Sequence, residues 1–285
     1  MIGESVGAGD SFLLRDVLPE KFLTEEFFKE ILSEVSWREQ VNRGGKVPRL
    51  LCYQGVLGED GSCPVYRVPS DEQFSTSPLT PLVNEIRQHV ERAVGQSFNH
   101  CLIQMYRTGL DYISEHSDKT LDISRGTSIA NLSLGAERVM RLCSKADTPG
   151  NRETISVALP HNSLFVLGWN TNRSHMHGIR PDKRQTFQKR PEETKFGGQR
   201  ISFTFRSIAT FVRVDGHVYG QGALYKSEDE LERALATGEY DVSRSVTVQS
   251  DEILNAFSKE NHFSNFDWEA QYGRGFDILR ISLNE

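Results

Sequence analysis

The sequence predicts a mainly β protein, an antiparallel sandwich or barrel with flanking α-helices and a C-terminal α/β extension. Three observations lead to this prediction: two helical patterns come first, a series of short strand-like segments fills residues 101–208, and the pattern changes again after Phe211. Short strands at regular spacing, separated by turn residues, are typical of sandwiches and barrels. We therefore expect three parts, residues 1–79, 80–211 and 212–285.

The first part is predicted to hold a helix over residues 23–37, which Thr24 can cap. Its apolar residues recur at helical spacing: Phe27, Phe28, Ile31, Leu32 and Val35. A second helix is predicted from Thr80, with a proline in its first turn, to Gly95. Residues 38–79 lie between the helices and show no clear periodicity, so we expect loops and short strands there, as a substrate-facing region or a plain connector.

The middle part is predicted to be the β core. Its seven strand-like segments are rich in β-branched and aromatic residues, and turn signals such as Ser-Arg-Gly and Pro-Gly separate them. The segments begin near residues 101, 111, 127, 138, 154, 163 and 200.

The last part, residues 212–285, is predicted to be an ordered extension that packs on the core. Ser227 and Glu230 form a capping box that opens a helix to about Gly238, and Ser250 is expected to begin another. The apolar face of that second helix would hold Ile253, Leu254 and Phe257. The tail segment ENHFSNFDWEAQYGRGFDIL is too aromatic for a disordered end.

Composition restricts the classes of function. The net charge of -6 gives no general attraction to nucleic acid or to an anionic membrane. There is no signal-like start and no apolar run of roughly 18 residues, so we expect an intracellular protein of the nucleus or cytoplasm, with no membrane partner, and a monomer. The cysteines form no C-x-x-C pair and are expected to be reduced and mostly buried: Cys52, Cys63, Cys101 and Cys143.

One segment is locally basic. Residues 180–195 hold six Lys and Arg side chains against three Asp and Glu side chains. Charge runs are often only solvated loops. If the segment instead follows a phosphate backbone, Arg184, Lys189 and Arg190 are its candidate contacts.

A possible metal motif lies at His116 and Asp118. Residues i and i+2 of a strand point to the same face, so this imidazole and this carboxylate can share one ion. The pair also arises by chance and decides nothing by itself. Two histidines and one carboxylate leave three positions open on iron for a co-substrate and O2, and the second histidine would be His175 or His177.

The strand-like segment at residues 200–206 carries a second signal. Arg200, Ser202, Thr204 and Arg206 share one face of this strand. Two arginines on one face of an otherwise apolar strand are costly unless they meet anions, and arginine pairs well with carboxylates. A dicarboxylate bound near the metal would satisfy both.

Together, FNHCLIQMY, HSD, HGIRP and RISFTFR at this spacing resemble the AlkB-type branch of the Fe(II)/2-oxoglutarate dioxygenases, from about Phe22 to Ile208. The resemblance implies a double-stranded β-helix, or jelly roll. It implies Fe(II) bound by His116, Asp118 and His177, with His177 preferred to His175 because HGIRP matches the family segment. Arg200 would hold the distal carboxylate of 2-oxoglutarate with a hydrogen bond from Tyr106.

The resemblance also implies further roles. Arg206 would lie near the keto-acid end of the co-substrate or near a substrate base. Gln104 and Ser202 replace asparagines that are common in the family, and both can still hydrogen-bond to 2-oxoglutarate. Thr120 stands where many nucleic-acid repair members carry an acid that contacts the damaged base.

The implied activity couples conversion of 2-oxoglutarate and O2 to succinate and CO2, at Fe(II), with oxidation of a substrate C–H bond. On an N-methyl group the product releases formaldehyde. We expect alkylated bases of DNA or RNA as substrates, although the net charge and Thr120 argue against nucleic acid. The alternatives are oxidation of a protein side chain or a small metabolite, and a non-catalytic binding module that keeps the fold.

Overall fold

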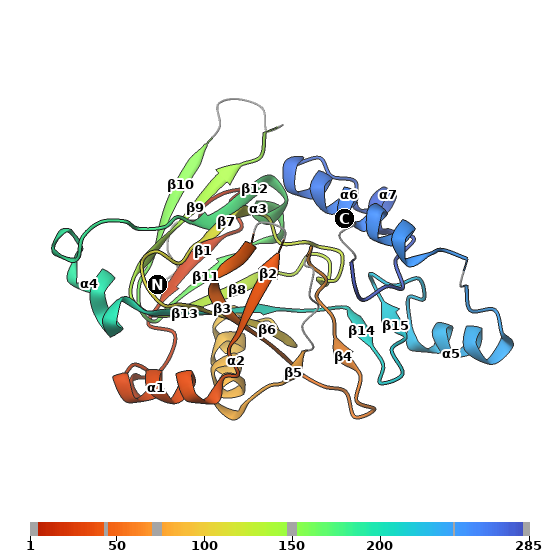
Figure 1. Cartoon of the computed structure of the whole chain (residues 1–285), viewed down its shortest axis with the longest axis horizontal. Coiled ribbons are helices and arrows are strands. Elements are labelled where there is room, and N and C mark those ends of the chain that lie inside the picture. Colours follow the sequence, from red (N-terminus) through yellow and green to blue (C-terminus); the bar gives the residue numbers. More distant parts are fainter. Residues whose placement is uncertain (1–4, 43–44, 70–75, 147–152, 242, 282–285) are drawn as a thin grey trace.

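The computed structural model describes residues 5–42, 45–69, 76–146, 153–241 and 243–281 (Figure 1). Within this part of the chain, two larger antiparallel sheets form the core. The first has the order β1-β11-β8-β13-β6-β3-β2, and β5 pairs in parallel with β3. Its strands are β1 (Phe12–Arg15), β2 (Arg38–Asn42), β3 (Gly45–Gly55), β5 (Ser77–Pro78), β6 (His100–Tyr106), β8 (Ile129–Gly135), β11 (Ser163–Leu167) and β13 (Arg200–Arg206).

The second sheet has the order β10-β9-β12-β7 and packs face to face with the first. Its strands are β7 (Ile113–His116), β9 (Arg138–Ser144), β10 (Thr154–Leu159) and β12 (His175–Ile179). One buried cluster contains Ile129 and Phe165 of the first sheet together with Met140 and Leu159 of the second. This two-layered antiparallel arrangement confirms the predicted jelly roll.

The N-terminal helices cover the outer face of the larger sheet (Figure 1). They are α1 (Glu25–Glu34) and α2 (Pro81–Val94), and η1 (Glu20–Phe22) precedes them. The hydroxyl of Thr24 accepts the Phe27 N–H, as its cap position predicts. Gly95 ends α2 with φ 73°. Thr80 stands at the N-cap position of α2, but its side chain forms no capping hydrogen bond and its hydroxyl instead donates to Gln54 at 3.3 Å.

All seven predicted strands are confirmed, but the sequence predicted only loops and short strands over residues 38–79. The structure has an 11-residue strand there, β3, paired with β2 and β6. Pro48 interrupts its apolar pattern, and a register shift in β2 accompanies it. The hydrogen bonds of two neighbouring strands stabilise β3 where its own sequence predicts little.

The chain between β11 and β13 contains β12 and four short helical segments. These segments are α3 (Trp169–Ser174), η2 (Thr186–Gln188), α4 (Pro191–Thr194) and η3 (Lys195–Gly198). The basic segment 180–195 falls within this connection. In the part of the chain that the structure describes, no helix has both the length and the apolar character needed to cross a bilayer.

The described residues of the predicted extension form regular elements and contact the core. A third sheet joins β4 (Cys63–Pro64), β14 (Thr210–Val212) and β15 (Val218–Gly220), and three helices follow: α5 (Glu228–Thr237), α6 (Val246–His262) and α7 (Trp268–Tyr272). Ser227 caps α5 as predicted. Helix α6 begins earlier than expected, since Ser245 caps it and Ser250 is buried inside it. The predicted boundary at residue 212 stays a prediction, because β14 spans it.

Arg67, which forms a buried ion pair within the core, also bonds to the extension. The guanidinium of Arg67 lies 2.6 Å from Asp122 and donates to the carbonyls of Phe276 and Ile278. Leu121 packs with Phe257 of α6 in the apolar cluster of the extension. Residues 121 and 122 directly follow the HSDKT segment, so the extension lies against the loop that carries the predicted metal ligands.

Candidate metal and co-substrate site

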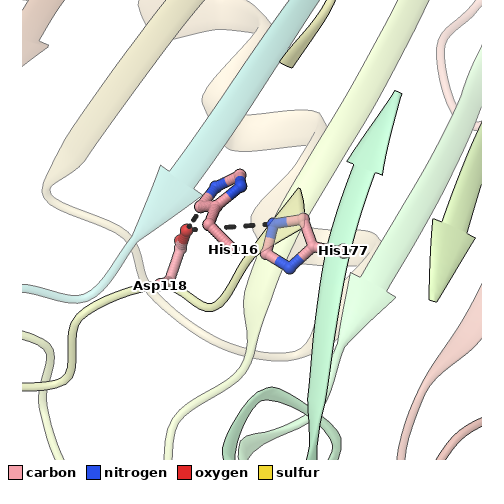
Figure 2. A group of neighbouring side chains, drawn as sticks. All are labelled: His116, Asp118 and His177. Atoms are coloured by element: carbon pink, nitrogen blue, oxygen red, sulfur yellow. Dashed lines mark ion pairs between the residues drawn. The ribbon is translucent and has the colours of Figure 1, made fainter. Parts of the chain in front are cut away.

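Three side chains come together at one edge of the sheet β10-β9-β12-β7: His116, Asp118 and His177 (Figure 2). His116 ends β7 and lies opposite His177 of β12 in the strand register, and Asp118 follows in the next loop. Their ligand atoms all lie within 4.8 Å of one another. Asp118 Oδ1 is 3.6 Å from His116 Nε2 and 3.9 Å from His177 Nε2. These spacings suit three ligands around one ion.

The protonation states of the cluster suit a cation. Burial would raise the pKa of Asp118, but the Arg206 guanidinium and the neighbouring imidazoles outweigh it and lower the pKa. Burial, followed by the nearby His116, lowers the pKa of His177 to about 3, so its ring is neutral and keeps a lone pair for a metal. Nδ1 of His116 lies 2.8 Å from the Ser114 carbonyl, which leaves Nε2 directed at the cluster.

His175 lies outside this group. It also belongs to β12, but its ring Nδ1 is 2.9 Å from the Ser174 hydroxyl and its backbone faces Ser144 of β9. The structure therefore brings together His177, and not His175, with His116 and Asp118.

Arg200 lies in a buried pocket that reaches from β13 to the metal cluster. It is 1% exposed, and burial lowers its pKa to about 10. Its Nη2 donates to Ser133 Oγ at 2.8 Å and to Asn131 Oδ1 at 3.2 Å, while its Nε and Nη1 have no partner among the described residues. A buried guanidinium with unpaired donors at Nε and Nη1 fits an anionic ligand.

The other predicted co-substrate residues line the same pocket. The ring of Tyr106 lies 5.1 Å from the Arg200 guanidinium carbon. Gln104 accepts a hydrogen bond from Arg49 Nε at 2.6 Å, and Ser202 Oγ accepts one from Asn131 at 2.9 Å. With the metal cluster at one end and Arg200 at the other, the pocket offers partners for both ends of a dicarboxylate such as 2-oxoglutarate.

Sequence reasoning missed Asn131. Its amide contacts Arg200, Ser202 and Thr204, so it organises the polar face of β13. A signal was present, because Asn131 and Ser133 alternate with buried apolar residues along β8. Polar residues at every second position of a buried strand indicate a second, polar face.

A wider cleft of roughly 750 Å³ opens over the metal cluster. Strands β2 and β3 form one wall and helix α6 lines another, with the metal ligands His116 and Asp118 between them. Aromatic and cationic side chains are frequent in its lining: Tyr53, Tyr66, Tyr112, Phe257, Lys46, Arg49, Lys119 and Arg206. Asp118 is the only carboxylate among the described residues that line this cleft. Sequence reasoning did not identify the α6 residues of this lining.

Thr120, a predicted substrate contact, points away from this cleft. Its N–H donates to Glu260 of α6 at 3.0 Å, and its hydroxyl contacts the same carboxylate oxygen. The structure therefore joins Thr120 to the extension and does not bring it to the lining of the cleft over the metal cluster.

The predicted phosphate contacts are paired with acids. Arg184 bonds to Asp182 at 2.9 Å and Glu193 at 2.6 Å, and Lys189 lies 3.3 Å from Asp182. Arg190 pairs with Glu137 and Glu193. Carboxylates inside and beside the segment offset its positive charge, and none of these three cations lines the cleft. Their contact with phosphate stays a prediction.

Comparison with known proteins identifies the family of this chain. The family model of the 2OG-Fe(II) oxygenase superfamily matches residues 11–206. The human DNA oxidative demethylase ALKBH2 is 32% identical over 203 residues, which cover 67% of this chain and 71% of that protein. The human alpha-ketoglutarate-dependent dioxygenase alkB homolog 3 is 26% identical over 189 residues, 63% of this chain and 60% of that protein. The solved structure of OsALKBH1 covers 73% of this chain and all of that chain, at 15% identity and a TM-score of 0.49. The chain therefore belongs to the AlkB-like branch of the 2OG-Fe(II) oxygenase superfamily, whose enzymes use Fe(II), 2-oxoglutarate and O2.

Proposed function

We propose that this enzyme oxidatively demethylates alkylated bases in DNA or RNA and releases formaldehyde. The observation that carries the proposal is the cleft over the metal cluster, lined by aromatic and cationic side chains with Asp118 as its one carboxylate among the described residues. Relatives named as DNA oxidative demethylases support the same substrate class. We place the activity in the nucleus or cytoplasm, where such substrates occur.

In this proposal His116, Asp118 and His177 bind Fe(II), and Arg200 binds the distal carboxylate of 2-oxoglutarate beside Tyr106. When bound, Fe(II) and 2-oxoglutarate supply the chemistry that uses O2 to hydroxylate an N-methyl carbon. Arg206 keeps Asp118 ionised and oriented. The buried walls of the pocket exclude water from the co-substrate.

The cleft would hold the target base outside its stack. Enzymes that modify a base take it out of the duplex or act on single strands, and they stack the base on aromatic side chains. Tyr53, Tyr66 and Tyr112 supply such surfaces near the cluster. Arg49 adds a positive charge beside Gln104 and can meet a phosphate or a polar base edge.

The test is a mass-spectrometric assay of oligonucleotides that carry one methylated base, with Fe(II), 2-oxoglutarate and O2. We expect loss of the methyl group together with formaldehyde and succinate, and no loss without 2-oxoglutarate or with a chelator. If the enzyme forms succinate but demethylates none of the DNA or RNA oligonucleotides, the proposal is wrong. Oxidation of a protein side chain or small metabolite would then replace it.

A further inference from the structure

The HSDKT loop presents Lys119, and not Thr120, to the cleft. Glu260 of α6 binds both the N–H and the hydroxyl of Thr120, and the Tyr272 hydroxyl donates to the other Glu260 oxygen at 2.7 Å. This buried network holds Thr120 toward the extension. Lys119, the next residue toward the metal ligand, lines the cleft instead.

Helix α6 also holds Lys119 in place. The Lys119 ammonium donates to the Ser117 carbonyl and to Asn261 Oδ1, each at 3.1 Å. The same Asn261 oxygen accepts the Ser117 N–H at 2.9 Å. An ammonium has three N–H donors, so one remains for a group in the cleft. Both hydrogen-bond partners of this ammonium are neutral groups.

We propose that Lys119, positioned by Asn261, selects methylated bases that present carbonyl oxygens beside the methylated nitrogen. The inference rests on the proposed demethylase function and names its substrate class. N3-methyluracil and N3-methylthymine are neutral and flank the methylated nitrogen with two carbonyl acceptors. 1-Methyladenine flanks its methylated nitrogen with an exocyclic nitrogen and no carbonyl, and 3-methylcytosine flanks it with an exocyclic nitrogen and only one carbonyl. Both are cations when protonated, so an ammonium donor would repel them.

The extension thereby determines the selectivity. Asn261 and Glu260 both belong to α6, which lies outside the residues 11–206 that match the family model. Glu260 turns Thr120 away, and Asn261 fixes the lysine that replaces it in the cleft.

The oxygen acceptor can belong to the base or to a phosphate, and the experiment separates these sources. kcat/KM is measured on oligonucleotides of one sequence that carry N3-methyluracil, N3-methylthymine, 1-methyladenine or 3-methylcytosine. We expect wild-type enzyme to prefer the first two. Lys119→Met should lower this preference by roughly tenfold to a hundredfold, the range of one good contact to a base edge. Lys119→Arg should retain most of it.

Asn261→Asp is a second variant, which keeps the shape of the side chain. Its carboxylate would form an ion pair with the Lys119 ammonium and offset its charge, so this variant should also reduce the preference. Lys259→Met is the matched control, because Lys259 is an exposed lysine of α6 that bonds to Gln271 outside the cleft. It should leave the preference unchanged. Circular dichroism melting shows whether each variant folds. If Lys119→Met does not fold, the preference of the wild-type enzyme still tests the inference.

Three results overturn the inference. A wild-type preference for 1-methyladenine and 3-methylcytosine contradicts it directly. If Lys119→Met leaves the preference unchanged and weakens the binding of all oligonucleotides equally, Lys119 contacts a phosphate and not the base. Demethylation of none of the oligonucleotides refutes the proposed function itself, whereas turnover with an unaltered ratio refutes only the role of Lys119.

Discussion

Arg206 donates two hydrogen bonds to Asp118 Oδ2, from Nε at 2.9 Å and from Nη2 at 2.7 Å. Both side chains are almost fully buried. Oδ1 of the same carboxylate faces the two histidines, so Arg206 fixes the orientation of a candidate metal ligand from behind. The sequence led us to expect Arg206 near the keto-acid end or a substrate base. Its Nη1 has no partner among the described residues, so that role stays a prediction beside the contact with Asp118.

Arg206→Gln should weaken metal binding and lower stability. Outer partners of metal ligands typically contribute tenfold to a hundredfold in affinity. Removing one partner of a buried ion pair costs about 3 to 5 kcal/mol. Affinity for Mn(II), a redox-stable substitute for iron, would be measured by competition with a chelator, and the free energy of unfolding by urea titration. Arg180→Gln is the control, because Arg180 is exposed. Unchanged affinity would show that Asp118 does not need Arg206.

His116→Ala and His177→Ala should each abolish bound metal and 2-oxoglutarate turnover while the protein still folds. Asp118→Ala should abolish both as well, but with a loss of stability, because it leaves the buried Arg206 guanidinium unpaired. The two histidines lie at the edge of a sheet whose apolar face packs in a core shared with the first sheet, so the fold does not depend on their rings. His175→Ala should keep its metal, since the ring contacts Ser174. Metal content and a Co(II) absorption spectrum would test this. Retention of metal by His177→Ala with loss in His175→Ala would reverse the assignment.

Arg200→Met should raise the KM for 2-oxoglutarate strongly. Truncation of one partner of a buried charged pair costs about 2 to 5 kcal/mol, which corresponds to at least roughly 30-fold in binding. Direct titration of 2-oxoglutarate into the Mn(II)-loaded protein gives the dissociation constant without turnover. Arg125→Met, at an exposed arginine over Trp268, is the control. Equal KM values for Arg200→Met and wild type would place the co-substrate elsewhere.

Two regions differ in the positive charge that they offer to phosphates. Arg49 lines the cleft and bonds to neutral acceptors, whereas Arg184, Lys189 and Arg190 pair with acids. The logarithm of the binding constant for an oligonucleotide falls linearly with the logarithm of salt concentration. We therefore expect Arg49→Gln to make this slope shallower by roughly 0.7 to 0.9, the contribution of one phosphate contact. The triple replacement of Arg184, Lys189 and Arg190 by Gln should change the slope less. Fluorescence anisotropy at several salt concentrations measures both, and the reverse order would assign phosphate contact to the segment 180–195.

The local pattern of the chain predicted the strands that alternate regularly, but it did not predict β12. Gly178 lies within β12, and a side-chain carbon there would approach the Ile113 carbonyl to 2.9 Å. Glycine thus allows β12 to lie close to β7 beside a register shift, which places His177 opposite His116. A propensity argument counts glycine against a strand, whereas tertiary packing requires it here.

His116 and His177 lie on neighbouring strands and Asp118 lies in the loop after β7, but the cleft could not be read from the sequence. Asn261 and Ser117 are 144 positions apart, and no periodicity links them. The same holds for Glu260, whose contact with Thr120 redirects the HSDKT loop. Side chains that meet across such separations are determined by the packing of α6 on the core, which a local pattern does not encode.

The stability of the metal-free protein should fall in acid because His100 is buried and neutral. His100 is 1% exposed beside the rings of Tyr53 and Tyr66, and neither of its ring nitrogens has a hydrogen-bond partner among the described residues. Burial, followed by the Arg206 charge, lowers the pKa of His100 to about 3, against 6.5 for a free histidine. The unfolded chain therefore binds a proton below pH 6.5 that the folded protein excludes.

This difference sets the sign and the window of the effect. Above pH 6.5 both states are neutral at His100 and stability does not depend on it. Between pH 6.5 and about 3, the folded state loses about 1.4 kcal/mol per pH unit from this residue. His100→Phe removes the titration and keeps an aromatic ring. The urea midpoint of unfolding would be measured from pH 7 to pH 4.5 in the presence of a chelator. It should fall less steeply with decreasing pH for His100→Phe than for wild type, and the difference in slope should correspond to one proton. Parallel curves for the two proteins would mean that His100 becomes charged without cost, and that its site is solvated in acid.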